Sequence, residues 1–116
     1  MKRVAAVLTV GMVVSLALGT RVAAAQTPDG AAVYRQHCRT CHGGTGNPSQ
    51  RMLGLYPKLK ALTDSTRMAG LSVDSIVALV RKGAGDMKPF AEKLSPEEMT
   101  AVAQYVRTLP SAAHKP

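Results

Sequence analysis

The residues of this chain whose types and spacing could do chemistry lie together in the segment CRTCH at positions 38–42, which contains both of its cysteines. A disulfide across so short a step would close almost no loop and would stabilise the fold little. A structural zinc ion needs four ligands, and His37 and His114 do not form a second ligand pair. A thioredoxin-like dithiol belongs on a strand–helix–strand pattern, which this chain does not offer.

Covalent attachment of haem is the fourth interpretation, and it gives every residue of the C-x-x-C-H motif a role. The thiols of Cys38 and Cys41 would bind the two vinyl groups of the porphyrin, and His42 would supply the proximal nitrogen to the iron. The motif therefore predicts one haem c attached through Cys38 and Cys41. A bare disulfide remains the alternative.

A second axial ligand is expected among the methionines that follow residue 25, which are Met52, Met68, Met87 and Met99. Met99 lies on the apolar stripe of a predicted helix, so core packing is its expected role. Met87 lies between two glycines and a proline, in a loop that could wrap over the far side of a haem. We therefore expect Met87 and His42 to be the metal ligands, with gap filling as the alternative role for Met87.

Three helices are predicted to position these residues, and no stretch alternates long enough to predict a strand. The first begins at the N-cap Asp29 and ends near residues 38–41. The second spans about 73–82. The third begins with a capping box at Ser95 and is expected to end at Pro110. Residues 43–51 are predicted to form a loop, residues 111–116 a frayed tail, and the fold class is all-α.

Two further expectations concern single residues. Pro57 argues against a regular helix through residues 53–62, because it cannot donate the backbone hydrogen bond. Helical spacing from Cys38 predicts that His37 is exposed.

With these features, the mature chain resembles the class I c-type cytochromes, which are small carriers with a single haem. The matching residues are Gly30 and Tyr34 of the first helix, the CRTCH motif, Pro57-Lys58-Leu59, Met87, and Val102, Tyr105 and Val106 of the last helix.

The resemblance implies a cytochrome c fold, with three main helices and loops wrapped around one covalently attached haem. It also implies that the Pro57 carbonyl accepts a hydrogen bond from His42. The family's tryptophan, which contacts a haem propionate, is missing, because the chain has no Trp. Arg51 and Tyr56 are candidates to replace it.

The start of the chain predicts export. A basic start, an apolar run from Val4 to Gly19 and the small residues before Gln26 form the three parts of a secretory signal. The run is shorter than the roughly 20 residues of a spanning helix, although an uncleaved membrane anchor is the alternative. We expect a signal peptide at residues 1–25, cleaved after Ala25, and one periplasmic cytochrome c domain at 26–116.

Composition limits the function further. Aromatic residues make up only 3% of the chain, so its own side chains make a thin core that a cofactor could fill. Removal of Lys2, Arg3 and Arg21 with the signal would lower the formal net charge from +8 to +5. A basic surface favours redox partners with acidic docking surfaces. No nucleic-acid partner and no membrane span in the mature chain are expected.

These observations predict an electron-transfer protein, monomeric or a subunit of a redox complex, and not an enzyme. One alternative is a haem protein with an open iron position, such as a ligand binder, a sensor or a small peroxidase. A thiol oxidoreductase is another. A third is a haem subunit of a larger dehydrogenase or oxidase.

Overall fold

The computed structural model describes residues 24–113, and the helices in this range enclose a small core. The elements are α1 (Gly30–His37), α2 (Arg39–His42), α3 (Gln50–Leu55), α4 (Ser65–Ala69), α5 (Val73–Lys82), α6 (Pro96–Val106) and α7 (Leu109–Ala113). Most of the predicted export signal and His114 lie outside the described residues. Within residues 24–113, none of the helices combines the length and the apolar character needed to cross a bilayer.

The long helices begin where the sequence provides caps. The Asp29 carboxylate accepts a hydrogen bond from the Ala31 amide at the start of α1, and Ser72 caps α5. At α6, the Ser95 hydroxyl and the Glu98 carboxylate exchange hydrogen bonds with each other's backbone amides. This reciprocal pair satisfies two amide donors that a helix start leaves free. The three predicted helices are therefore confirmed, with α1 and α2 together forming the first.

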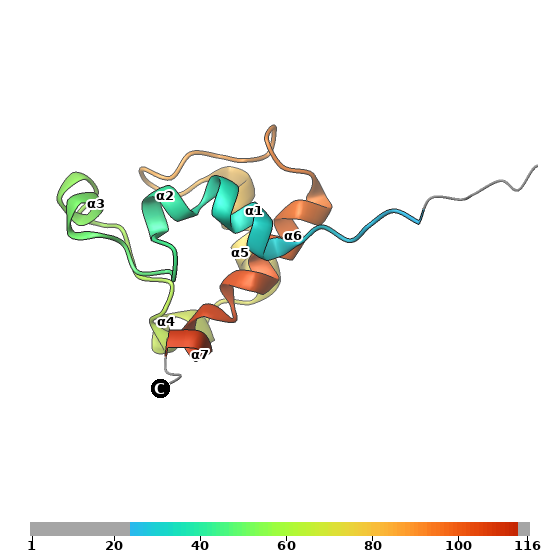
Figure 1. Ribbon diagram of the computed structural model, residues 1–116. Coiled ribbons are helices and arrows are strands. Elements are labelled where there is room, and N and C mark those ends of the chain that lie inside the picture. Colours follow the sequence, from blue (N-terminus) through green and yellow to red (C-terminus); the bar gives the residue numbers. More distant parts are fainter. Residues whose placement is uncertain (1–23, 114–116) are drawn as a thin grey trace, which may run out of the picture.

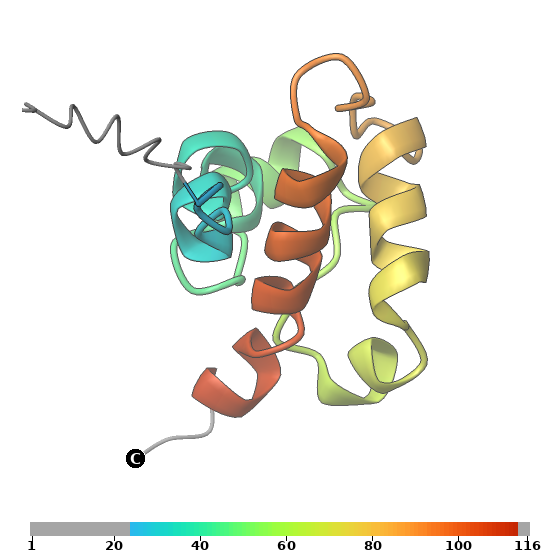
Figure 2. The ribbon, with the colours of Figure 1, turned by 90° about the vertical axis from the view of Figure 1, so that its right-hand side faces the viewer.

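Helix α6 is the centre of the packing, because it contacts both α1 and α5 (Figure 2). The crossing with α1 is close at Gly30, where a Cβ atom would collide with the backbone carbonyl of Ala101. Beside this contact, the rings of Tyr34 and Tyr105 lie 5.3 Å apart between centroids. The third helix and α1 thus meet at the residues that the family resemblance indicated.

The apolar stripes predicted for α5 and α6 form most of the core. Its buried members include Tyr34 from α1, Met68 from α4, Ile76 and Val80 from α5, and Met99, Val102, Ala103 and Val106 from α6. All described core residues are apolar or tyrosine, and none of the buried residues is charged. The core is therefore built from aliphatic side chains, as the low aromatic content predicted.

Three short helices were not predicted. Helices α3 and α4 begin at the side-chain caps Ser49 and Asp64. Helix α3 lies apart from the other helices in Figure 1, at the end of the segment that joins α2 to α4. The expected end of the third helix at Pro110 was wrong, because α6 ends at Val106 and Pro110 lies in the first turn of α7. Proline is tolerated there, since a first-turn amide has no helical partner. Residues 111–113, expected to fray, belong to this helix.

Candidate functional site

An apolar cavity of about 390 Å³ lies between the helices and the two long loops. Its floor is formed by the predicted stripes, with Ile76 and Val80 from α5 and Val102 and Val106 from α6. Met68 of α4 completes this apolar surface. The side chains of the described residues do not fill the middle of the domain, which is what the sequence led us to expect.

The two cysteines and His42 line this cavity together. Helix α1 ends at His37, and at Cys38 the chain turns into the short helix α2, which carries Cys41 and His42. Cys38 is half-buried and Cys41 is exposed, and both thiols are free. Burial, and then the neighbouring Cys41, raise the pKa of the Cys38 thiol to about 11. Cys38 and Cys41 therefore do not form the disulfide that was the alternative interpretation.

His42 lies half-buried at the cavity wall with a ring nitrogen that lacks a partner. Its Nδ1 atom is buried and makes no hydrogen bond. Burial lowers the pKa of His42, and the positive charge of Arg67 lowers it further. The backbone of Lys60 raises the pKa of His42, but it does not form a hydrogen bond of regular geometry with the buried Nδ1.

The expected hydrogen bond from His42 to the Pro57 carbonyl was wrong. Pro57 is exposed and does not line the cavity. The reason is a turn in which the Leu59 amide donates to the Tyr56 carbonyl at 2.9 Å, with Pro57 at its second position. Proline is favoured at this place because its φ angle is already fixed there. The backbone group that acts on the pKa of His42 belongs instead to Lys60, three residues further on.

Tyr34 holds the residue that directly follows the CRTCH segment 38–42. Its hydroxyl donates to the Gly43 carbonyl at 2.7 Å, directly after His42, and the side chain is fully buried. Burial is the main cause that raises the pKa of Tyr34 to about 12. Tyr34 therefore remains a neutral hydrogen-bond donor at physiological pH and ties α1 to the residues beyond α2.

The loop between α5 and α6 brings Met87 to the same cavity. Ala84 and Met87 exchange backbone hydrogen bonds of 3.1 and 3.0 Å, and the Phe90 amide donates to the Val80 carbonyl at 2.9 Å. Gly83 makes this tight loop possible, because its φ is +73° and a Cβ would collide with the Met87 carbonyl. The loop is therefore held at both ends.

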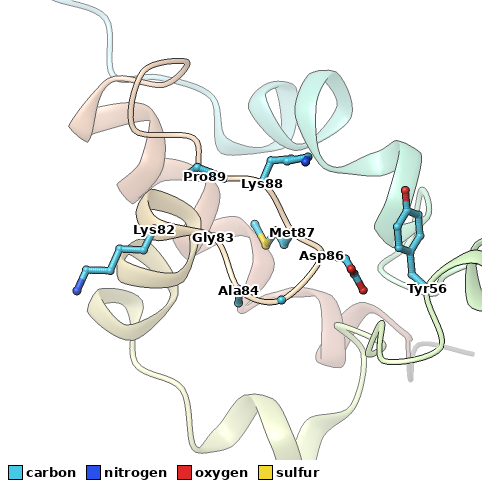
Figure 3. A pocket seen from close by; sticks show the side chains of 9 residues that line it. Tyr56, Lys82, Gly83, Ala84, Asp86, Met87, Lys88 and Pro89 are labelled. Carbon is cyan, nitrogen blue, oxygen red and sulfur yellow. The ribbon is translucent and has the colours of Figure 1, made fainter.

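Of the four candidate methionines, Met68 and Met87 line the cavity, whereas Met52 and Met99 do not. Met68 is only 3% exposed and belongs to the core cluster, while Met87 is half-buried in the loop. Outside the Met87 loop, a more open hollow of about 440 Å³ is lined by residues 82–89 and Tyr56 (Figure 3). Asp86 lies between Met87 and Tyr56 in that view.

His37 is not fully exposed, contrary to the prediction. It is half-buried, lines the cavity, and packs edge-on against Phe90 with ring centroids 6.1 Å apart. The helical projection failed because Phe90 comes from the distant α5–α6 loop. Helical spacing describes only the face of α1, and it does not say which loop covers that face.

Cationic side chains gather around the cavity. The lining includes Lys58, Lys60, Arg67 and Lys88, with Asp86 as the only carboxylate among the described residues that form it. Tyr56 also lines the cavity, so it remains a candidate neighbour of a haem edge. Arg51 does not, so the structure does not support the other candidate that the sequence suggested.

This set of donors fits a covalently attached haem. Two free thiols, an imidazole and a thioether surround one apolar space, and the buried Nδ1 of His42 indicates a ring whose hydrogen bonding is still incomplete. In the described part of the chain, no group of three or more His, Cys, Asp or Glu residues could hold a metal ion alone. Sequence reasoning missed Lys60 and Arg67, because neither lies in a recognisable motif.

Comparisons with known proteins agree with this geometry. The family model described as "Cytochrome C oxidase, cbb3-type, subunit III" matches residues 25–106. Cytochrome c6 of Microcystis aeruginosa is 37% identical over 78 residues, which cover 67% of this chain and 90% of that protein. The chloroplastic cytochrome c6 of Chlamydomonas reinhardtii is 37% identical over 95 residues, covering 79% of this chain and 62% of that protein.

A solved structure supports the fold directly. The structure titled "KustC0563 c-type cytochrome" superposes with a TM-score of 0.64 at 38% sequence identity. The superposition covers 71% of this chain and 98% of that one. The all-α arrangement predicted from the sequence is therefore shared with a c-type cytochrome.

Proposed function

The chain belongs to the class I c-type cytochromes, and from this premise we propose that it is an exported electron carrier in which His42 and Met87 are the axial ligands of one haem c. Because the chain belongs to this family, its cofactor is haem c and its general activity is electron transfer. The assignment of each ligand, the export and the choice of partner are the parts proposed here.

One observation carries the ligand assignment. His42 and Met87 are far apart in the sequence, yet both line one apolar cavity together with Cys38 and Cys41. When bound, the haem supplies a one-electron couple at its iron. The imidazole and the thioether would occupy both axial positions, so no substrate could bind. A soft sulfur ligand favours the reduced state and raises the reduction potential relative to two nitrogen ligands.

The chain's own residues support this role by keeping the site dry and rigid. The apolar side chains of α5 and α6 form a wall that would shield a bound haem from water. The hydrogen bonds that close the Met87 loop and the bond from Tyr34 to Gly43 hold both ligand segments in place. Little rearrangement is then needed when the charge of the site changes, which suits rapid electron transfer.

The partner is proposed to carry an acidic docking surface. Lys58, Lys60 and Lys88 lie at the cavity, and Leu79, which also lines it, is 36% exposed. An exposed apolar side chain among cations suits a brief, small interface steered by charge. The rate of electron transfer to an acidic partner should therefore fall as the salt concentration rises.

Two measurements on purified protein test the carrier function. The protein is made in a host that attaches haem c, and a denaturing gel stained for haem shows whether the attachment is covalent. The spectrum of the oxidised protein should contain the long-wavelength band that iron–thioether ligation gives. If this band is absent and the reduced protein binds carbon monoxide rapidly, the iron has an open position and the sensor or peroxidase alternative is correct.

Export is proposed from the first 25 residues, with cleavage after Ala25. N-terminal sequencing of the mature protein should begin at Gln26. A retained N-terminus in the membrane fraction would instead support the uncleaved anchor.

A second candidate function is that of a haem subunit in a larger oxidase. The family model is named for subunit III of cbb3-type oxidases. The FixP subunit of Azorhizobium caulinodans is 33% identical over 81 residues, which cover 26% of that protein. Gel filtration of native extracts separates the two cases, because a free carrier elutes at the mass of this chain alone.

A further inference from the structure

One ring contact connects the two segments that carry the proposed axial ligands. His37 is the last residue of α1 and directly precedes the CRTCH segment 38–42. Phe90 lies in the loop of residues 83–95, three residues after Met87. The two rings pack edge-on, with 6.1 Å between centroids and 81° between planes, and both residues line the cavity. The contact therefore joins the attachment side of the cavity to the Met87 loop.

Phe90 is held in place through its backbone and through its ring. Its amide donates to the Val80 carbonyl at 2.9 Å, and its carbonyl accepts from the Lys93 and Leu94 amides at 2.9 and 3.0 Å. Leu94 is 4% exposed and belongs to the core. The Lys93 ammonium lies 5.7 Å from the centroid of the Phe90 ring, close enough for a cation to be attracted to it. Phe90 is therefore a fixed point of the loop.

The part of the loop around Met87 has little burial of its own. Between residues 84 and 89, Met87 is the one residue that is not exposed. An exposed segment with few buried contacts is one that opens locally at small cost in free energy. A contact that restrains Phe90 should therefore have a measurable effect on how often the loop leaves the cavity.

The energy of the ring contact acts on the loop more than on α1. Helix α1 is already fixed against α6, by the close approach of Gly30 to Ala101 and by the ring pair of Tyr34 and Tyr105. The His37 side chain is half-buried, and among the described residues it makes no side-chain hydrogen bond that would hold it elsewhere. An edge-on aromatic pair contributes stability beyond the area that it buries.

We propose that His37 is a positioning residue for the distal ligand, which acts through Phe90 to keep the Met87 loop over the haem. This proposal rests on the proposed function, since it requires Met87 to bind the iron. When the loop opens, the thioether leaves and a ligand from solution can donate its own electron pair at the vacated position, with no change of oxidation state. The fraction of molecules with an open loop sets the apparent affinity for that ligand.

Imidazole is a suitable probe, because its nitrogen competes with the thioether for the iron. It is titrated into the oxidised holoproteins of wild type, His37→Ala, His37→Phe and Gln36→Ala, and loss of the thioether band gives each apparent dissociation constant. Gln36 is the matched control, because it precedes His37 in α1 but is exposed and does not line the cavity. His37→Asn replaces His37→Ala if that variant yields too little holoprotein. Denaturant titration of each variant reports the global stability separately.

We expect imidazole to bind His37→Ala about three- to tenfold more tightly than wild type, which corresponds to the loss of one aromatic pair. His37→Phe keeps an aromatic ring and should remain within about twofold of wild type. Gln36→Ala should match wild type. Equal dissociation constants for His37→Ala and Gln36→Ala would overturn the proposal.

A double-mutant cycle tests whether Phe90 is the route of the effect. Phe90→Leu removes the ring but leaves an apolar side chain at this position. If His37 acts through Phe90, adding His37→Ala to Phe90→Leu should change the imidazole constant little further. Fully additive effects would show that His37 acts by another route, and the proposal would be wrong.

Two further results separate the possible failures. If His37→Ala lowers only the global stability and leaves the imidazole constant unchanged, His37 is an ordinary packing residue and the proposal is wrong. If the oxidised wild type has no thioether band, the ligand assignment of the proposed function fails, and the proposal fails with it. The wild-type spectrum therefore distinguishes failure of the proposed function from failure of the role of His37 alone.

Discussion

Met68 and Met87 both line the cavity, and each carries a thioether sulfur, but they lie in different kinds of structure. Met68 lies on a helix in the packed core, whereas Met87 lies in a loop held by its own hydrogen bonds. A loop can lie over a haem bound in the cavity more easily than a side chain packed in the core can turn toward it. We therefore propose Met87, and not Met68, as the distal ligand.

Replacing each of these methionines by leucine tests this distinction with one chemical change. Met87→Leu should abolish the thioether band, open the iron to carbon monoxide and shift the potential by a sizeable part of the roughly 0.8 V that axial ligands span. Met68→Leu conserves volume and should cost less than about 1.5 kcal/mol while keeping the band. Loss of the band in Met68→Leu alone would identify Met68 as the ligand.

Tyr34 is the residue for which the structure gives the clearest pH prediction. Tyr34→Phe removes the hydroxyl that donates to Gly43 at 2.7 Å. It should therefore lower the free energy of unfolding by about 1–3 kcal/mol, measured by denaturant titration of the holoprotein. Tyr56→Phe, at a residue that is 37% exposed, is the matched control and should change stability little.

The sign of the pH effect follows from the raised pKa of Tyr34. Its pKa is about 12 in the folded protein and about 10 when unfolded, so folding favours the protonated hydroxyl. This contribution is complete below about pH 10 and is lost as the pH rises through about 12. Tyr34→Phe should therefore lose less stability than the wild type over that interval. An identical loss in both proteins would contradict this assignment.

At the residue scale, the sequence predicted the groups that can be recognised by spacing, and these groups line one cavity. Cys38, Cys41 and His42 form a contiguous motif, and Met87 is marked by its glycines and proline. Pro57 and His37 were placed incorrectly, because the neighbours of each depend on how a loop folds back. Arg67 carried no sequence signal, since an isolated arginine on a short helix resembles any solvated residue.

At the scale of elements, the α5–α6 loop depends on two glycines that differ in their surroundings. Gly83 and Gly85 both have positive φ angles, of 73° and 56°. A Cβ at Gly83 would collide with the carbonyl of Met87, whereas a Cβ at Gly85 meets nothing within 4 Å. The two positions therefore share backbone strain but differ in contact with the backbone of Met87.

Alanine substitutions separate these two effects. Gly85→Ala should cost about 1 kcal/mol in stability from the left-handed backbone and leave the thioether band intact. Gly83→Ala adds the collision and should displace Met87, so the band should weaken and carbon monoxide binding should increase. The absorption spectrum of each oxidised protein gives the answer. Equal spectra would show that Gly83 does not position Met87.

Elements with strong end signals were predictable, and those without were not. Helices α5 and α6 combine side-chain caps with apolar stripes of several turns. Helices α3 and α4 also have caps, at Ser49 and Asp64, but they are too short to show a periodic stripe. Their caps resemble ordinary loop residues. Pro110 was misread because proline marks both the end of one helix and the first turn of another.

At the scale of the whole molecule, the cavity dominates the energetics. The thin aliphatic core borders a partly open apolar cavity of about 390 Å³ that its own side chains do not fill. Without a cofactor, the apolar walls of this cavity would stay in contact with water and would contribute little to folding. A small domain has a total stability of only about 5–15 kcal/mol, so the loss of this burial matters. The cofactor is therefore expected to be part of the folded core.

We therefore expect that the chain does not fold stably without haem. The double variant Cys38→Ala/Cys41→Ala, purified without haem, should lose most of its far-ultraviolet helical signal and its cooperative thermal transition. Added haem should restore part of the helix content, because His42 and Met87 remain able to bind the iron. A haem-free variant that unfolds as cooperatively as the holoprotein would mean that the walls close over the cavity. The apolar stripes of α5 and α6 would then suffice to form the core alone.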